Sequence, residues 1–310
     1  MDVSSAVKAG IDRLDKQARR FARRLINYSG YDISRTDNGK PRWSGVAEDY
    51  YPINVRPRWG YSCNSHDIIV KLLNSEIESF KLLLSDFKKC EDIFASIPYD
   101  QLSPTQPCWN NAFFSTLDAA ALMYFAMRRK PGIYLEIGSG YSTKFMKSAI
   151  DHAGLDTRII SIDPHPRSEV DNICNDLIRS PLEDVDLAIF DRLGSGDICF
   201  FDGSHRVFTN SDTTVFFIDV LPHLKKGVLV HIHDIFWPDD YTPEWNGRLY
   251  SEQYLLGALL LSGSPRYRVV LPNYFVAKNA STAAIINTLA IPSVYPGTTK
   301  PGLSFWLEIL

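Results

Sequence analysis

From residue 132 onward, the chain alternates short apolar segments with segments of helical periodicity. The apolar segments cover 133–137, 158–163, 177–179, 197–202 and 228–233, and the helical segments cover 142–153, 168–176, 182–192, 209–224 and 251–261. Short strands that alternate with helices form right-handed βαβ units, whose strands lie parallel in one sheet. The pattern therefore predicts an α/β fold with a doubly wound sheet and helices on both of its faces.

The first third of the chain lacks this alternation. Apolar residues at spacings of three and four, on an otherwise basic segment, predict an amphipathic helix at residues 4–27. Such a helix can lie on an anionic membrane, and it can also pack on its own domain or on a second copy of the chain. We favour packing, so we expect a homo-oligomer as one outcome. An irregular segment rich in Tyr and Trp follows at 28–63. Further helical patterns cover 65–94 and 113–129, and a last strand covers 304–309. We expect an extension and cap at 1–110 and the α/β domain at 111–310.

Composition excludes several classes of protein. The apolar fraction is 45% and the charged fraction 22%, which are ordinary values for a globular domain. A net charge of −3 gives no field that would recruit nucleic acid. The longest apolar stretches fall short of the roughly 20 residues that span a bilayer. Five scattered cysteines without a CxxC pair, and the lack of an apolar secretory block, favour a cytoplasmic location.

A glycine-containing turn joins the first strand of the alternating region to its helix. Gly138 and Gly140 allow the backbone to turn tightly and to approach a ligand, and the helix start offers free amide groups. Asp163 ends the next strand, where a carboxylate accepts both hydroxyls of a ribose. Thr143 stands where a dinucleotide fingerprint has its third glycine, and Glu136 adds a carboxylate suited to an ammonium group. S-adenosylmethionine has such a group and NAD lacks it.

The motifs around this turn resemble a known family. The sequences EIGSG at 136–140, SIDPHP at 161–166, FDGSH at 201–205 and LKKGVLVHIHD at 224–234 stand in the order found in class I S-adenosylmethionine-dependent methyltransferases. The last two are most similar to the branch that methylates hydroxyl groups of small molecules and sugars. The resemblance implies a seven-stranded sheet of order 3-2-1-4-5-7-6, with the last strand antiparallel.

The resemblance also implies a set of residues around S-adenosylmethionine. Glu136 and the glycine turn would surround its methionine end, Ser142 and Thr143 would face its carboxylate, and Asp163 would bind the ribose. The full set that the resemblance implies is Glu136, Gly138, Ser139, Gly140, Ser142, Thr143, Asp163, Pro164, His165, Leu182, Glu183 and Asp202.

Two histidines are the candidates for catalysis. Asp202 and His205 follow the fourth strand, and His233 and Asp234 follow the fifth, so all four should meet at the carboxyl edge of the sheet. A hydroxyl acceptor needs a base, and we favour His205, with His233 second and Asp234 beside them. The alternative is that His205 only bonds to the helix after it.

Asp202, His233 and Asp234 also form a candidate metal site. Some members of the family that the chain resembles hold a divalent ion with an Asp after the fourth strand and an Asp–Asn or Asp–Asp pair after the fifth. His233 departs from that oxygen-only set, so manganese, iron or zinc would suit these residues better than magnesium.

The sequence thus predicts an S-adenosylmethionine-dependent O-methyltransferase that acts on a small molecule or glycan. An NAD-dependent nucleotide-sugar oxidoreductase or epimerase is one alternative, and a catalytically silent cofactor-binding subunit is another. The residues expected to shape the acceptor pocket are Trp237, Asp239, Asp240, Tyr241 and Trp245.

Overall fold

A computed structural model describes residues 36–37, 40–41, 56–166, 168–293 and 302–310. The chain divides into two compact units, residues 1–53 and residues 54–310. In the first, β1 (Thr36–Asp37) pairs antiparallel with β2 (Lys40–Pro41). The helix predicted at 4–27 lies outside the described residues. Everything below concerns the second unit.

Seven strands form one sheet in the second unit. They are β3 (Ile133–Ile137), β4 (Arg158–Ile162), β5 (Asp176–Ile178), β6 (Ile198–Phe201), β7 (Leu229–Ile232), β8 (Tyr267–Pro272) and β9 (Phe305–Ile309). Their order across the sheet is β5-β4-β3-β6-β7-β9-β8, and β9 runs antiparallel to both of its neighbours. Numbered along the chain, this order is 3-2-1-4-5-7-6, so the predicted topology is confirmed.

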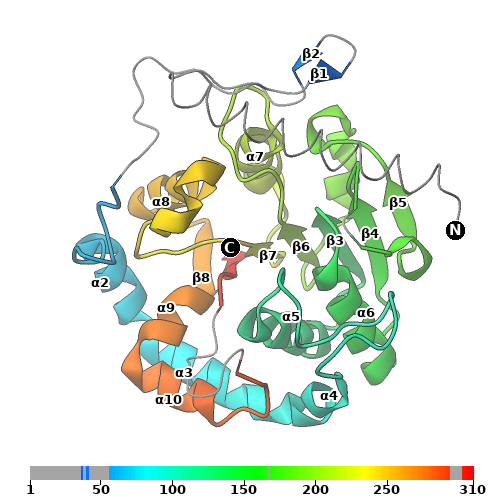
Figure 1. The fold of residues 1–310 in the computed structure, drawn as a ribbon, viewed down its shortest axis with the longest axis horizontal. Helices are drawn as coiled ribbons and strands as arrows, with labels where there is room; N and C mark the ends of the chain where they lie inside the picture. Colours follow the sequence, from blue (N-terminus) through cyan, green and yellow to red (C-terminus); the bar gives the residue numbers. More distant parts are fainter. Residues whose placement is uncertain (1–35, 38–39, 42–55, 167, 294–301) are drawn as a thin grey trace, which may run out of the picture. The chain divides into compact units, whose positions relative to one another are not determined.

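Helices cover the sheet on both sides, as predicted (Figure 1). On one side lie α5 (Thr116–Arg129) and α6 (Tyr141–Ala153), which pack against each other. On the other side lies α7 (Asp212–Val215), which continues as a π-helical turn and then a 3-10 turn, so the helix predicted at 209–224 has three parts. After β7 come a 3-10 turn (Pro243–Arg248) and α8 (Glu252–Leu261).

Two of the predicted helices on the way from β4 to β6 are 3-10 turns. The segment predicted as a helix at 168–176 holds η2 (Asp171–Ile173), and the one at 182–192 holds η3 (Leu182–Asp184) and η4 (Leu187–Arg192). The Asp186 side chain accepts a hydrogen bond from the amide of Ala188 at 3.0 Å. Asp side chains that bond nearby amides in this way compete with a continuous helix.

The predicted helix at 65–94 is broken into shorter pieces. They are α2 (Asp67–Ser75), α3 (Ile77–Asp86), η1 (Phe87–Cys90) and α4 (Glu91–Ser96). The other two helices of the unit, α9 (Asn273–Lys278) and α10 (Ala280–Asn287), follow β8, and α10 packs beside α3. Residues 54–110 therefore belong to the same compact unit as the sheet, and their function as a cap stays a prediction.

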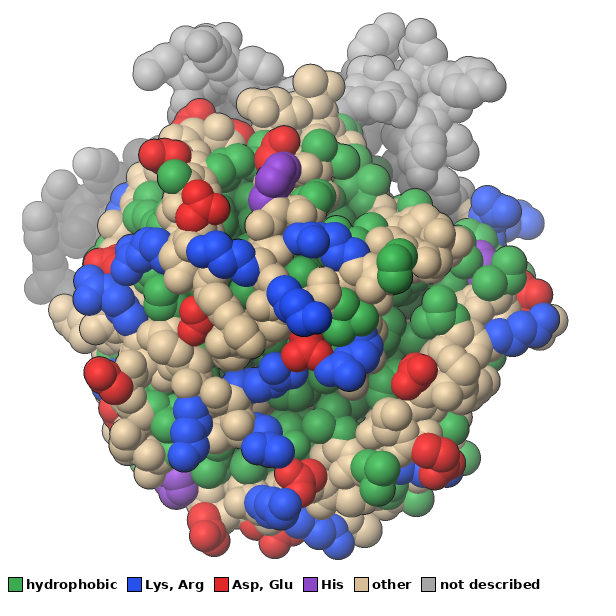
Figure 2. All heavy atoms as spheres, turned by 180° about the vertical axis from the view of Figure 1, so that it is seen from behind, with side chains coloured by type: hydrophobic (Ala, Val, Ile, Leu, Met, Phe, Trp, Pro, Cys, Tyr) green, Lys and Arg blue, Asp and Glu red, His purple; other side chains and the backbone are tan. Residues whose placement is uncertain are grey.

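The core lies on both faces of the sheet, as parallel strands require. Phe200 faces α5 and α6 and lies 6.2 Å from Phe114 between ring centroids, whereas Phe201 stacks on Phe216 of the opposite layer at 4.2 Å. Within the described residues, no helix is both long and apolar enough to cross a bilayer. The face seen from behind mixes Lys and Arg side chains with Asp and Glu (Figure 2).

Candidate functional site

The backbone of the glycine turn after β3 packs closely against the end of β6. Gly138 has a positive φ of +81°, and a Cβ there would lie 2.0 Å from the carbonyl oxygen of Asp202. The Asp202 amide in turn donates to the Ile137 carbonyl at 2.9 Å. Only glycine combines this backbone angle with this close approach, so Gly138 fixes the distance between the two strand ends. A Cβ at Gly140 would meet no atom within 4 Å, so Gly140 does not have the same constraint.

Glu136 is fully buried, and its carboxylate is hydrogen-bonded to neighbouring side chains. It accepts hydrogen bonds from the hydroxyls of Thr143 at 2.5 Å, Tyr134 at 3.1 Å and Ser142 at 3.3 Å. Ser142 and Thr143 are buried with it in the first turn of α6. These three residues therefore bond to one another, and direct contact of their side chains with a cofactor stays a prediction.

Burial makes Glu136 a source of pH-dependent stability. Desolvation raises its pKa to about 8, against the ordinary 4.5, despite the three hydroxyl donors. The folded chain then holds a proton that the unfolded chain releases between these values, so the free energy of unfolding should fall as the pH rises from about 5 to about 8. In Glu136→Gln this fall should be smaller. Urea unfolding at several pH values measures it, and parallel curves for the two proteins would contradict the assignment.

A cavity of about 390 Å³ opens at the carboxyl ends of β3, β4 and β6. Eight of the residues predicted to bind a cofactor line it, namely Gly138, Ser139, Asp163, Pro164, His165, Leu182, Glu183 and Asp202. Of the predicted catalytic residues, His205 lines it as well. Glu136, Gly140, Ser142, Thr143, His233 and Asp234 are not among its lining residues.

Asp163 joins the glycine turn to the loop after β4. One of its oxygens accepts from the amide and hydroxyl of Ser139, at 2.8 and 3.0 Å. The other accepts from the amide of His165 at 2.8 Å. The side chain is partly exposed, and carboxylate oxygens accept more than one hydrogen bond each. Asp163 therefore keeps acceptor capacity toward the cavity.

His205 is held from both sides of its ring. Its Nδ1 lies 2.7 Å from Glu252 Oε1, and its Nε2 lies 3.2 Å from Asp202 Oδ1 and 3.6 Å from Asp234 Oδ2. The ring stacks on Tyr250, and the backbone adopts a positive φ of +62°. Although burial alone would lower it, the carboxylates of Glu252 and Asp202 hold the pKa of His205 well above its ordinary range.

Nothing in the local sequence pattern selects Glu252, the fully buried first residue of α8. An acidic residue in the first turn of a helix is common because the helix dipole favours it. Because the helix start already explains an acid at this position, the sequence does not indicate that Glu252 contacts His205, which lies 47 residues earlier.

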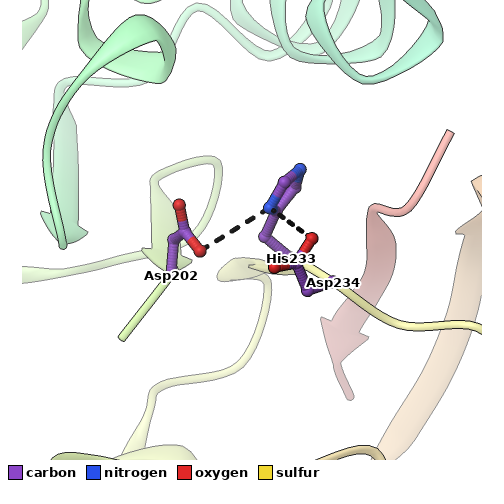
Figure 3. Close-up of side chains that lie close together, drawn as sticks. All are labelled: Asp202, His233 and Asp234. Atoms are coloured by element: carbon purple, nitrogen blue, oxygen red, sulfur yellow. Dashed lines mark ion pairs between the residues drawn. The ribbon is translucent and has the colours of Figure 1, made fainter. Parts of the chain in front are cut away.

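His233, Asp234 and Asp202 form a second cluster beside His205 (Figure 3). His233 Nδ1 lies 3.3 Å from Asp234 Oδ1 and 3.6 Å from Asp202 Oδ1, and ligand atoms from all three residues lie within 4.8 Å of one another. On the far side of the ring, Nε2 lies 3.4 Å from Asp118 Oδ2 of α5. The predicted convergence of four residues at the strand ends is therefore seen in the structure, and Asp118 joins it.

The aromatic and acidic loop after β7 differs from the expected acceptor pocket. Asp239 is buried and bonds Ser65, Tyr274 and Lys278, and Asp240 is buried against the backbone of Arg58 and Trp59. Trp237 and Tyr241 are buried as well, and Trp245 stays partly exposed. Asp239 and Asp240 both bond to the segment at residues 56–66, which packs against them. Because both carboxylates are buried in these contacts, they are not available to sugar hydroxyls.

Comparison with known proteins decides the class of enzyme. Residues 135–235 match the family described as a methyltransferase domain, and this segment runs from the glycine turn through the His233–Asp234 pair. By this match, residues 135–235 form a methyltransferase domain. This match, the strand order and the order of the four motifs agree, and they count against the NAD-dependent alternative.

Solved methyltransferases resemble this one only distantly. The O-methyltransferase TomG from Streptomyces achromogenes is 16% identical, with 73% of this chain and 97% of that chain covered and a TM-score of 0.40. An O-methyltransferase from Bacillus cereus is 13% identical, with 73% of this chain and 99% of that chain covered and a TM-score of 0.39. The methyltransferase PaMTH1 from Podospora anserina is 17% identical, with 63% of this chain and 78% of that chain covered and a TM-score of 0.37. No curated protein sequence matches the chain.

Proposed function

We propose that this methyltransferase transfers the methyl group to a hydroxyl of a small molecule, and that His205 accepts the hydroxyl proton. One observation carries the proposal: His205 lines the same cavity as Asp163, with its Nδ1 held by Glu252. In the neutral ring this contact would place the proton on Nδ1, so that Nε2, which faces Asp202 and Asp234, would be the nitrogen that accepts the proton of the substrate hydroxyl. An alkyl hydroxyl needs such a base, because it is a weak nucleophile until its proton is removed.

Different residues along the cavity have different proposed roles in binding the cofactor and positioning the acceptor. Gly138 and Ser139 bring backbone close to the ligand, and Asp163 accepts hydrogen bonds from the ribose hydroxyls. Leu182 and Glu183, on the same cavity, would hold the adenine. When bound, S-adenosylmethionine supplies an electrophilic methyl group on its sulfonium. Asp202 and His205, at the other strand end, position the acceptor in line with it.

A divalent cation held by Asp202, His233 and Asp234 is part of the same proposal. Such an ion acts as a Lewis acid that polarises an acceptor oxygen and favours loss of its proton. A cation at Asp202 and Asp234 would also offset the carboxylate charge that keeps His205 protonated, so the base and the metal site are linked.

Asp163→Ala should weaken binding of S-adenosylhomocysteine about 10- to 100-fold, since hydrogen bonds to a charged group contribute about 1.5 to 3 kcal/mol. Titration calorimetry measures the change. The matched control is Asp171→Ala, which removes a carboxylate bonded to Arg179 and not among the cavity-lining residues. Equal weakening by both substitutions would contradict the ribose assignment.

The proposed reaction is tested by supplying S-adenosylmethionine and a panel of hydroxylated acceptors, including phenols, alcohols and sugars. Mass spectrometry should find one hydroxyl methylated together with formation of S-adenosylhomocysteine. Transfer to an amine or thiol acceptor alone would overturn the hydroxyl assignment. Tight cofactor binding with transfer to no acceptor would instead favour the silent subunit.

Two further predictions concern the whole chain. The scattered cysteines favour a cytoplasmic location, and self-association through residues 4–27 stays a prediction that light scattering of the full chain measures.

A further inference from the structure

His233 is the side chain in the cluster that most needs explaining. Its ring is buried, with 3% of its surface exposed, and neither nitrogen makes a hydrogen bond of ordinary geometry: Nε2 faces Asp118 at 3.4 Å, and Nδ1 faces the carboxylates of Asp234 and Asp202 at 3.3 and 3.6 Å. The ring packs against Phe114, 5.2 Å away, and Phe200, 6.3 Å away, which offer no polar partner. A buried polar nitrogen that makes no hydrogen bond costs free energy, so we take Nδ1 to be placed for a group that binds between it and the two carboxylates.

The charges around the ring show what kind of group is needed. Four carboxylates surround the two imidazoles, those of Asp118, Asp202, Asp234 and Glu252. Among the described residues, no Lys or Arg forms an ion pair with any of the four. With all four carboxylates ionised, even two protonated histidines would leave a net negative charge in a largely buried site. A cation restores the balance that buried carboxylates require.

Asp118 is fixed in place behind the ring. One of its oxygens accepts hydrogen bonds from Asn273 Nδ2 at 2.7 Å, the Ser304 amide at 2.8 Å and the Leu303 amide at 2.9 Å. The second oxygen lies 3.4 Å from His233 Nε2. A carboxylate behind a metal-binding histidine takes the proton-bearing nitrogen and directs the other nitrogen to the metal.

We propose that Asp118 is a positioning residue that directs His233 Nδ1 to a cation held with Asp202 and Asp234, and that this mixed set selects a transition-metal ion over Mg²⁺. The inference rests on the cation in the proposed function and adds Asp118 and the class of ion. Mg²⁺ prefers an all-oxygen shell, whereas imidazole suits Zn²⁺, Fe²⁺ and Co²⁺.

Metal binding tests this directly, without the methyl-transfer reaction. The full chain is dialysed against a chelator and titrated with Mg²⁺, Zn²⁺ and Co²⁺ by calorimetry, with the visible absorption of Co²⁺ as a second readout. Co²⁺ should bind at least about tenfold more tightly than Mg²⁺. A chain that binds none of these ions, or that prefers Mg²⁺, would overturn the inference.

Two substitutions separate positioning from ligation. Asp118→Asn should weaken Co²⁺ binding about 10- to 100-fold and shift its absorption band, as loss of an orienting carboxylate does. His233→Asn replaces the imidazole by an oxygen donor and should remove the preference for Co²⁺ over Mg²⁺, and this variant decides the matter if Asp118→Asn does not fold. Asp163→Asn removes a cavity carboxylate outside the cluster and is the matched control. Co²⁺ binding by Asp118→Asn as tight as in the original chain would overturn the positioning role.

The same samples distinguish this inference from the proposed function. Methyl transfer that continues in a chain shown to bind no metal overturns the inference and leaves the hydroxyl methylation standing. Tight Co²⁺ binding that Asp118→Asn weakens, in a chain that methylates no hydroxyl, supports the inference and overturns the proposed function.

Discussion

His205→Asn should lower kcat for methyl transfer about 10²- to 10⁴-fold, the usual contribution of a positioned general base. Asparagine is suited to this test because position 205 has a φ of +62°, and Asn tolerates that left-handed region better than most residues. The fold should therefore survive while the proton acceptor is lost. Steady-state kinetics measures the rate, and calorimetry should show that S-adenosylhomocysteine still binds.

Glu252→Gln is the companion variant. It keeps an oxygen beside His205 Nδ1 but removes the negative charge, so its kcat should fall between those of the original chain and His205→Asn. A His205→Asn enzyme with undiminished kcat would show that the base is another group, and a Glu252→Gln enzyme slower than His205→Asn would assign the larger role to Glu252.

Gly138→Ala should destabilise the protein by about 2 to 5 kcal/mol, the second large effect that we expect. A left-handed alanine costs about 1 to 2 kcal/mol, and forcing a methyl group into a filled space costs about 1 to 3 kcal/mol more. The added Cβ would lie 2.0 Å from the Asp202 carbonyl oxygen, so the turn must move away from β6. Because both strand ends line the cavity, cofactor affinity should fall with stability. Urea unfolding measures the loss of stability, and calorimetry measures the loss of cofactor affinity.

Gly154→Ala separates the two contributions. Gly154 ends α6 with a φ of +60°, and a Cβ there would meet no atom within 4 Å. It therefore carries the backbone cost of about 1 to 2 kcal/mol without the collision. If both alanine variants lost the same stability, the contact between the turn and β6 would not be the constraint that we describe.

The parallel strands β3 to β7 could be predicted from the sequence because each is a short apolar run followed by a turn, whereas the order of the seven strands was implied by the family resemblance. Gly138 and Asp163 stand at such ends, and strand ends of a parallel sheet meet at one edge whatever the loops do. The segments of η2 and η4 were predicted as helices and are 3-10 turns, and at η4 the Asp186 side chain bonds the Ala188 amide.

Asp118 and Glu252 could not be selected from the sequence for a different reason. Asp118 follows Ser115 at capping-box spacing, and the Ser115 hydroxyl donates to its carboxylate at 2.7 Å. Each acid thus has a sufficient local role at a helix start. Their second contacts, with His233 and His205, depend on how α5 and α8 pack against the sheet, and local periodicity carries no information on that packing.

The placement of β9 has a consequence for the order in which the site is built during synthesis. β9 inserts between β7 and β8, and the amides of Leu303 and Ser304 just before it hold Asp118. Domains generally fold as units, and residues 54–310 form one compact unit. Because Asp118 is held by amides that lie 185 and 186 residues later in the chain, the support behind His233 is complete only after residues 303–309 have been synthesised. A chain that stops before β9 would therefore lack the fixed carboxylate behind His233.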